Sequence, residues 1–122
     1  MGYGIEMQNK DGSICQVPSH TEGGNIVVGG TTDASISVTY NYSWFYYRVL
    51  DKDKGLRWLY GKTGHEVTHR LSEAVQELGY NQYQKDYWAD TPGNAGHALK
   101  VLLDWAITNP DGVFYVTDKL NE

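Results

Sequence analysis

Hydrophobic and polar residues alternate along the first third of the chain, in the pattern of half-buried strands. The run 34–42 alternates most strictly and predicts a strand with one apolar face. The members of that face are Ala34, Ile36, Val38, Tyr40 and Tyr42. Segments 4–8 and 13–17 flank an Asp-Gly turn within 9–12, which favours a hairpin. With a β-branched run at 25–28, these segments predict an antiparallel meander.

Two later segments show the 3.6-residue spacing of amphipathic helices. Thr63 is followed three residues later by Glu66, and this spacing predicts a capping box at the start of the first helix. Gly79 is expected to end that helix. Thr91 and Pro92 predict the N-cap and the first turn of the second helix. The expected buried stripes are Val67, Leu71, Ala74, Val75 and Leu78 in the first helix, and Ala95, Ala98, Leu99, Leu102, Leu103 and Ala106 in the second.

Shorter elements are expected on either side of these helices. The apolar run 43–50 fits a strand or a short helix, and Ser43 as a cap favours the helix. Residues 56–60 predict a second short helical piece, and 113–117 predict a last strand after the turn at 109–112. The element order therefore predicts an α+β fold in which an antiparallel sheet packs on two amphipathic helices. The sheet is expected to combine the N-terminal meander with the C-terminal strand.

The length of 122 residues indicates a single domain over residues 1–122. A domain of this size buries enough surface to fold without a metal or a disulfide, and we expect no cofactor. Cys15 is the only cysteine, which fits a reducing compartment, and a core position is expected for it. The first residues lack the basic and apolar parts of a signal peptide, and no apolar run is long enough to span a membrane. We expect a cytoplasmic protein without membrane association.

The formal net charge of −5 argues against binding of long nucleic acid, because such binding needs many cations to neutralise phosphates. A small nucleotide needs only a few cations. The segment 48–70 holds most of the basic residues, and four of them, Arg48, Arg57, Lys62 and Arg70, are candidates to bind phosphates.

The segment 65–69 matches the H-E-x-x-H pattern of zinc hydrolases, in which two histidines bind Zn²⁺ and the glutamate acts as base. Glu66 already has a structural role as the capping-box partner of Thr63. His65 and His69 fall opposite the apolar stripe and should face solvent. We therefore expect no metal site here, although a zinc hydrolase stays as a remote alternative.

The turn before the second helix combines features of a ligand site. Tyr87 and Trp88 offer flat rings, and Gly93 and Asn94 lie at a helix start, where backbone N–H groups favour an anion. These four residues, together with the four cations above, are the predicted ligand-binding residues. No catalytic constellation is identifiable, so a non-enzymatic protein is expected.

The chain contains 16 aromatic residues, of which ten are tyrosines, more than a core of this size needs. The surplus indicates a subunit interface or a pocket that binds a ring, and we expect a homo-oligomer. Trp105 falls between the buried and polar faces of its helix and is expected at the edge.

Several segments resemble a family of small proteins common in phages and prophages. The segments that carry this resemblance are 39–43, 59–64, 86–88, 91–95 and 109–113. The chain also resembles phage sponge proteins that sequester the cyclic ADP-ribose signal of the Thoeris defence system. That resemblance implies a sheet around C-terminal helices, an oligomer in the cytoplasm of the infected bacterium, and binding of a cyclised ADP-ribose without turnover. It also implies a second site for cyclic oligonucleotides.

The leading hypothesis is thus a phage-encoded binding protein for a nucleotide-type immune signal, which counteracts bacterial anti-phage defence. An assembly accessory protein of a phage, whose aromatics serve only subunit contacts, is the alternative from another class.

Overall fold

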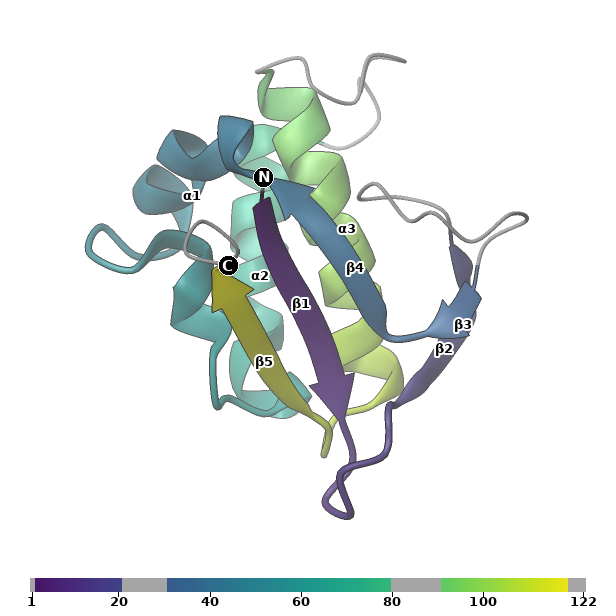
Figure 1. The fold of residues 1–122 in the computed structure, drawn as a ribbon. Coiled ribbons are helices and arrows are strands. Elements are labelled where there is room, and N and C mark those ends of the chain that lie inside the picture. Colours follow the sequence, from purple (N-terminus) through teal and green to yellow (C-terminus); the bar gives the residue numbers. More distant parts are fainter. Residues whose placement is uncertain (1, 21–30, 80–90, 119–122) are drawn as a thin grey trace.

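The computed structural model describes residues 2–20, 31–79 and 91–118 of the chain (Figure 1). The elements in chain order are β1 (Gly2–Gln8), β2 (Gln16–His20), β3 (Thr31–Asp33), β4 (Ser35–Thr39), the 3₁₀ helix η1 (Tyr40–Tyr42), α1 (Ser43–Val49), the 3₁₀ helix η2 (Gly55–Leu59), α2 (Gly64–Leu78), α3 (Pro92–Thr108) and β5 (Val113–Asp118).

The main sheet is antiparallel and has the strand order β4-β1-β5. Helices α2 and α3 lie against one face of this sheet, and the other face is turned toward the viewer in Figure 1. The predicted α+β fold, with an antiparallel sheet packed on two amphipathic helices, is therefore confirmed. Of the described helices, none is both long enough and apolar enough to cross a membrane.

The N-terminal strands pair differently from a simple meander. The turn at 9–12 is followed by a single bridge between Gln8 and Ile14, after which β2 leaves β1 and pairs with β3 in a second, two-stranded sheet. This leaves both edges of β1 to partners that are distant in sequence, β4 and β5. The predicted strand at 25–28 lies outside the described residues.

The alternating run 34–42 is shorter as a strand than its pattern suggests. The strand β4 ends at Thr39, whose hydroxyl accepts a hydrogen bond from the Asn41 N–H at 3.2 Å and so starts the turn of η1. Tyr42 is nevertheless buried, because η1 turns it into the core. The cap made by Thr39 therefore ends the strand early, but Tyr42 still packs in the core as the alternating pattern predicts.

The predicted short helices are confirmed as α1 and η2, with one correction to the capping. Ser43 is the first residue of α1 and not its N-cap, a position that Tyr42 occupies. Its hydroxyl instead forms a 2.8 Å hydrogen bond with the Tyr3 hydroxyl, which ties α1 to β1.

Both long helices begin as predicted. The Thr63–Glu66 capping box is present at the start of α2, and Gly79 follows its last turn. Thr91 caps α3 and Pro92 occupies the first turn. The predicted apolar stripes of both helices are buried.

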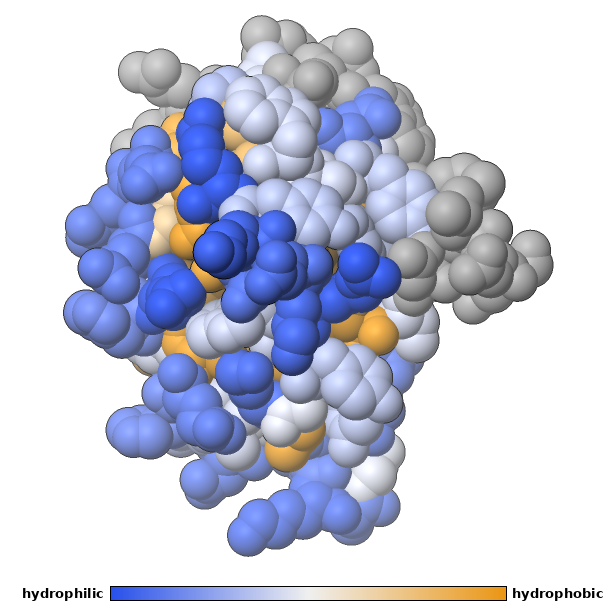
Figure 2. Space-filling view, turned by 90° about the vertical axis from the view of Figure 1, so that its left-hand side faces the viewer, coloured by the Kyte–Doolittle hydropathy of each residue, from blue (hydrophilic) through white to orange (hydrophobic). Residues whose placement is uncertain are grey.

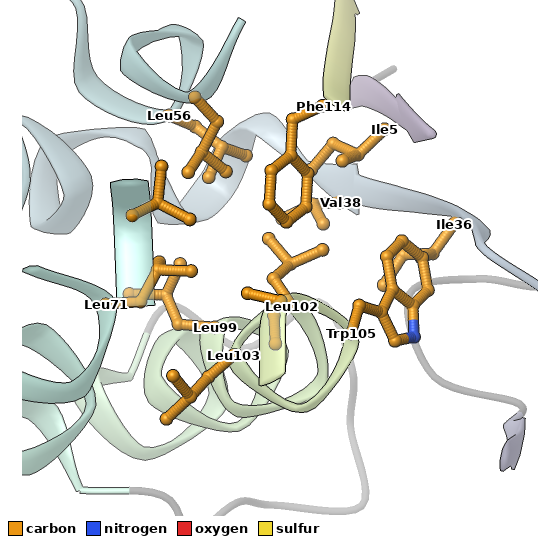
Figure 3. Packing of buried hydrophobic residues seen from close by; sticks show 14 of the residues in the cluster. Ile5, Ile36, Val38, Leu56, Leu71, Leu99, Leu102, Leu103, Trp105 and Phe114 are labelled. Carbon is orange, nitrogen blue, oxygen red and sulfur yellow. The ribbon is translucent and has the colours of Figure 1, made fainter. Parts of the chain in front are cut away.

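One core joins the sheet to the helices. Figure 3 shows Leu102 of α3 directed toward Phe114 of β5, and Trp105 beside Ile36 of β4. Trp105 is only 2% exposed, so its predicted position at the helix edge is wrong. The sheet reaches far enough along α3 to cover this ring, which the polarity pattern of one helix does not reveal.

Candidate functional site

The turn before α3 offers less to an anion than its sequence suggests. Gly93 and Asn94 lie in the first turn of the helix, whereas Tyr87 and Trp88 lie outside the described residues. The Asn94 N–H donates to the Thr91 hydroxyl at 3.1 Å, and the Ala95 N–H donates to the Thr91 carbonyl at 3.1 Å. Asn94 is also only 5% exposed. The backbone N–H groups of Asn94 and Ala95 are therefore already engaged within the helix start.

The backbone N–H groups at the start of α2 are also engaged, two of them by a turn that is distant in sequence. The Gly64 N–H donates to the Gly112 carbonyl and the His65 N–H donates to the Pro110 carbonyl, both at 2.9 Å. The Glu66 N–H donates to the Thr63 hydroxyl at 3.2 Å. The turn that precedes β5 thus closes the start of α2.

The H-E-x-x-H segment is built as part of a helix cap. One carboxylate oxygen of Glu66 accepts hydrogen bonds from the Thr63 backbone N–H at 3.0 Å and from the Thr63 hydroxyl at 3.1 Å. These bonds lower the pKa of Glu66, the backbone bond having the larger effect. His65 is exposed, and the imidazole of His69 lies 3.4 Å from the Glu73 carboxylate. Over residues 2–20, 31–79 and 91–118, no three His, Cys, Asp or Glu side chains form a group that could hold a metal ion.

Cys15 is 1% exposed, as expected for a core residue. Its Sγ donates to the Asn9 side-chain oxygen at 3.3 Å. Burial raises the pKa of this thiol, so the reactive thiolate is disfavoured.

Each of the four predicted cationic residues contacts an exposed or half-exposed aromatic residue of α1 or η2, and these two elements lie against each other, so the contacts form a surface. We call this surface the aromatic–cationic face. It consists of Trp44, Tyr47, Arg48, Arg57, Trp58, Lys62 and Arg70. Figure 2 views the side that carries α1 and η2, and the deepest blue side chains gather around its middle with paler ones between them. The fold therefore assembles residues from α1, η2, α2 and the segment between the last two.

Trp58 lies at the centre of one group of contacts on this face. The Lys62 ammonium is 5.0 Å from the centroid of its ring, and the Arg70 guanidinium is 5.4 Å away. Both distances are within cation–π range. Arg70 also donates a hydrogen bond to the Leu50 carbonyl at the C-terminal end of α1, where the helix dipole favours a cation. Arg70 is thereby held in a structural position, whereas Lys62 carries its charge on a flexible stem.

A second group of contacts lies along α1. The Arg48 guanidinium is 5.3 Å from the Trp44 ring centroid and 5.6 Å from that of Phe45. It also lies 3.8 Å from the Glu77 carboxylate, with both side chains at least half exposed. An exposed pair at this distance is weak and is easily exchanged for another anion. Trp44 is 53% exposed.

Arg57 forms the third contact pair. One nitrogen of its guanidinium donates to the Tyr47 hydroxyl at 3.2 Å. The ring of Tyr47 covers Gly55, where an added Cβ would lie 3.3 Å from ring carbons. Gly55 has φ +57°, so it lets the chain turn directly beneath this ring.

Cations and rings on one surface suit an anion that also carries an aromatic ring. The sequence identified the four cations but not their partners Trp44, Tyr47 and Trp58. A signal was present, because Trp44 and Arg48, and also Trp58 and Lys62, are four residues apart. The contact of Arg70 with Trp58 depends on the packing of α2 and could not be read from spacing.

Comparison of the chain with models of protein families, with curated proteins and with solved structures gave no match.

Proposed function

We propose that this chain is a non-enzymatic binding protein that sequesters a small nucleotide-type signal of the cyclic ADP-ribose class. The ligand would bind on the aromatic–cationic face. The observation that carries the proposal is the placement of Lys62 beside Trp58 and of Arg48 beside Trp44. The likeness of several segments to phage proteins supports a role against a host immune signal.

Each part of such a ligand has a matching group on this face. The half-exposed Arg48 and the flexible Lys62 supply charge for a pyrophosphate. The indole of Trp44, 53% exposed, supplies a surface on which an adenine stacks. Arg70 is a positioning residue in this proposal, because its guanidinium is held by the Leu50 carbonyl.

The test is isothermal titration of the protein with isomers of cyclic ADP-ribose. We expect binding by the natural sequence and roughly tenfold weaker binding, or ~1.4 kcal/mol, in Lys62→Gln and in Arg48→Gln. Trp44→Ala should weaken binding by a similar factor, because stacking contributes ~1–3 kcal/mol per base. The matched control is Lys100→Gln, which removes the same charge from α3, where Lys100 pairs with Asp104 at 2.6 Å.

Absence of heat with every isomer, at protein concentrations of tens of micromolar, overturns the proposal. Equal weakening by Lys100→Gln would also overturn it, since the effect would then be one of net charge. In either case the surface rings would be better explained as subunit contacts of an assembly protein. That reading predicts that Trp44→Ala changes the oligomeric state, which light scattering measures.

A further inference from the structure

The outer face of the main sheet forms a hollow around a glycine. Two rows of residues cross the three strands on this face: Ser37, Gly4 and Thr117 in one row, and Ser35, Glu6 and Tyr115 in the next. Side chains of neighbouring strands stand about 4.8 Å apart. Because Gly4 has no side chain, the centre of the first row is empty. The result is an open hollow of about 160 Å³ on the side of the sheet away from α2 and α3 (Figure 1).

Glu6 and Thr117 contribute hydrogen-bond acceptors to the walls of this hollow. The Glu6 carboxylate accepts a bond from the Gln8 amide at 3.1 Å and keeps further lone pairs. The Thr117 hydroxyl donates to the Gly4 carbonyl at 3.3 Å, so its oxygen remains an acceptor. Among the described residues that line the hollow, none is Lys, Arg or His. The charge that this lining presents is therefore negative.

An aromatic wall completes the hollow. The Tyr115 ring lines it, and the Tyr60 ring meets Tyr115 edge to face, with centroids 5.8 Å apart and an interplanar angle of 82°. This contact fixes the orientation of Tyr115. The face of a tyrosine ring attracts a cation. Glu6 of β1 pairs with Tyr115 of β5. The carboxylate and the ring therefore stand side by side on the same face of the sheet.

We propose that this hollow binds a small organic cation, namely the primary ammonium group of an aliphatic amine. An ammonium has three donors and no acceptor, which complements the Glu6 carboxylate and the Thr117 hydroxyl oxygen. Its charge pairs with Glu6, and its position beside Tyr115 adds a cation–π contact. The net charge of −5 favours the approach of a cation as well. This site is separate from the aromatic–cationic face and does not depend on the function proposed for it.

The experiment is an NMR titration of the ¹⁵N-labelled protein with 1,4-diaminobutane, and in parallel with the neutral 1,4-butanediol. We expect the diamine to shift the amide signals of residues 4–6, 35–37 and 115–117, with a Kd in the millimolar range. The diol should leave these signals in place. Glu6→Gln should weaken diamine binding at least tenfold. The matched control Glu73→Gln removes one exposed carboxylate from α2 and should leave binding unchanged.

A second variant tests the shape of the hollow. Gly4 does not have a positive φ, and a branched side chain suits a strand, so Gly4→Val should fold while filling the space. Its amide spectrum reports folding directly, and the diamine shifts should be lost. Gly4→Ala, which adds a single methyl group, replaces it if Gly4→Val does not fold. The proposal is overturned if the diamine gives no localised shift, if the diol binds equally well, or if Glu73→Gln weakens binding as much as Glu6→Gln.

Discussion

Single residues decide how closely α2 and α3 approach each other. A Cβ on Gly96 of α3 would lie 1.8 Å from the Gly79 carbonyl oxygen, and a Cβ on Gly64 of α2 would lie 2.6 Å from the carbonyl oxygens of Ala106 and Asn109. The neighbours are backbone atoms, which cannot rotate away. Glycine is thus required at both ends of this helix pair for reasons of space.

Gly96→Ala should therefore destabilise the protein despite the higher helix propensity of alanine. The added methyl group forces α2 and α3 apart, and we expect a loss of about 1–3 kcal/mol in the free energy of unfolding. Urea denaturation followed by circular dichroism measures this loss. The exposed Gln76→Ala on α2 is the control and should change stability by less than about 0.5 kcal/mol. If Gly96→Ala and Gln76→Ala have the same free energy of unfolding, the prediction is contradicted, because α2 and α3 would then accommodate the added methyl group without loss of stability.

Glu66 makes the stability of α2 depend on pH. Hydrogen bonds from the backbone and the side chain of Thr63 lower the pKa of Glu66 below its ordinary value of 4.5. The folded state therefore holds the proton of Glu66 more weakly than the unfolded state does. The resulting stabilisation is present above pH 4.5 and is lost as the pH falls through the lowered pKa.

Glu66→Gln should remove this contribution. The variant is expected to be less stable than the natural protein at pH 7, and the difference should shrink as the pH falls well below 4.5. Thermal unfolding at a series of pH values measures both curves. Hydrogen bonds also lower the pKa values of Asp11 and Asp51. Both residues are present in the variant and in the natural protein, so their contributions to the pH dependence of stability cancel in the comparison. A difference that is independent of pH would contradict the assignment.

At the scale of elements, short contacts tie α1 and η2 to the helix pair. Arg70 of α2 reaches the Leu50 carbonyl at the end of α1 and the Trp58 ring of η2. The Tyr46 hydroxyl of α1 donates to the Ala95 carbonyl of α3 at 3.1 Å. These contacts hold α1 and η2, which carry most of the aromatic–cationic face, against the helix pair.

The variants Arg70→Met and Lys62→Met should differ in stability, because we assign a structural role to Arg70 and a ligand-binding role to Lys62. Loss of the hydrogen bond to Leu50 should cost about 1–2 kcal/mol in Arg70→Met, since a charged donor is lost. Lys62→Met should change stability by less than about 0.5 kcal/mol. Thermal unfolding of the two variants under the same conditions provides the measurement. If both variants lose the same stability, the division of roles is wrong.

At the scale of the whole molecule, one core connects the sheet to the helices. Trp105 is among its largest fully buried side chains and lies beside Ile36 of β4. The two candidate sites lie outside this core, on different surfaces and with opposite charge preferences. One lies on α1, η2 and α2, and the other lies on the outer face of the sheet.

The substitution Trp105→Ala should accordingly destabilise the protein strongly, because it leaves a large cavity between the sheet and α3. We expect a loss of about 3–5 kcal/mol in the free energy of unfolding, measured by urea denaturation. The control is Ile107→Ala, two residues along the same helix, where the side chain is 60% exposed. This control should change stability by less than about 0.5 kcal/mol. A small effect of Trp105→Ala would place the indole outside the core.

The sequence alone determined the two long helices, their N-terminal caps and their predicted buried stripes, together with the α+β class. These features depend on residues a few positions apart, such as Thr63 with Glu66, and their physics is local. Four of the predicted ligand residues, Arg48, Arg57, Lys62 and Arg70, also lie close together in sequence. The surface they share depends on how α1, η2 and α2 pack together, so the sequence identified these residues but not their arrangement.

Only the tertiary structure decided the contacts between distant segments. It paired β1 with β4 and β5, buried Trp105 beneath β4, engaged the start of α2 with the turn before β5, and placed Arg70 on Trp58. It also placed Gly4 at the centre of the outer sheet face, between β4 and β5, which are far apart in the chain, and so left a hollow there. Such contacts depend on how separate elements pack together and exclude water. The hydrophobic pattern of one segment does not indicate which other segment it will pack against.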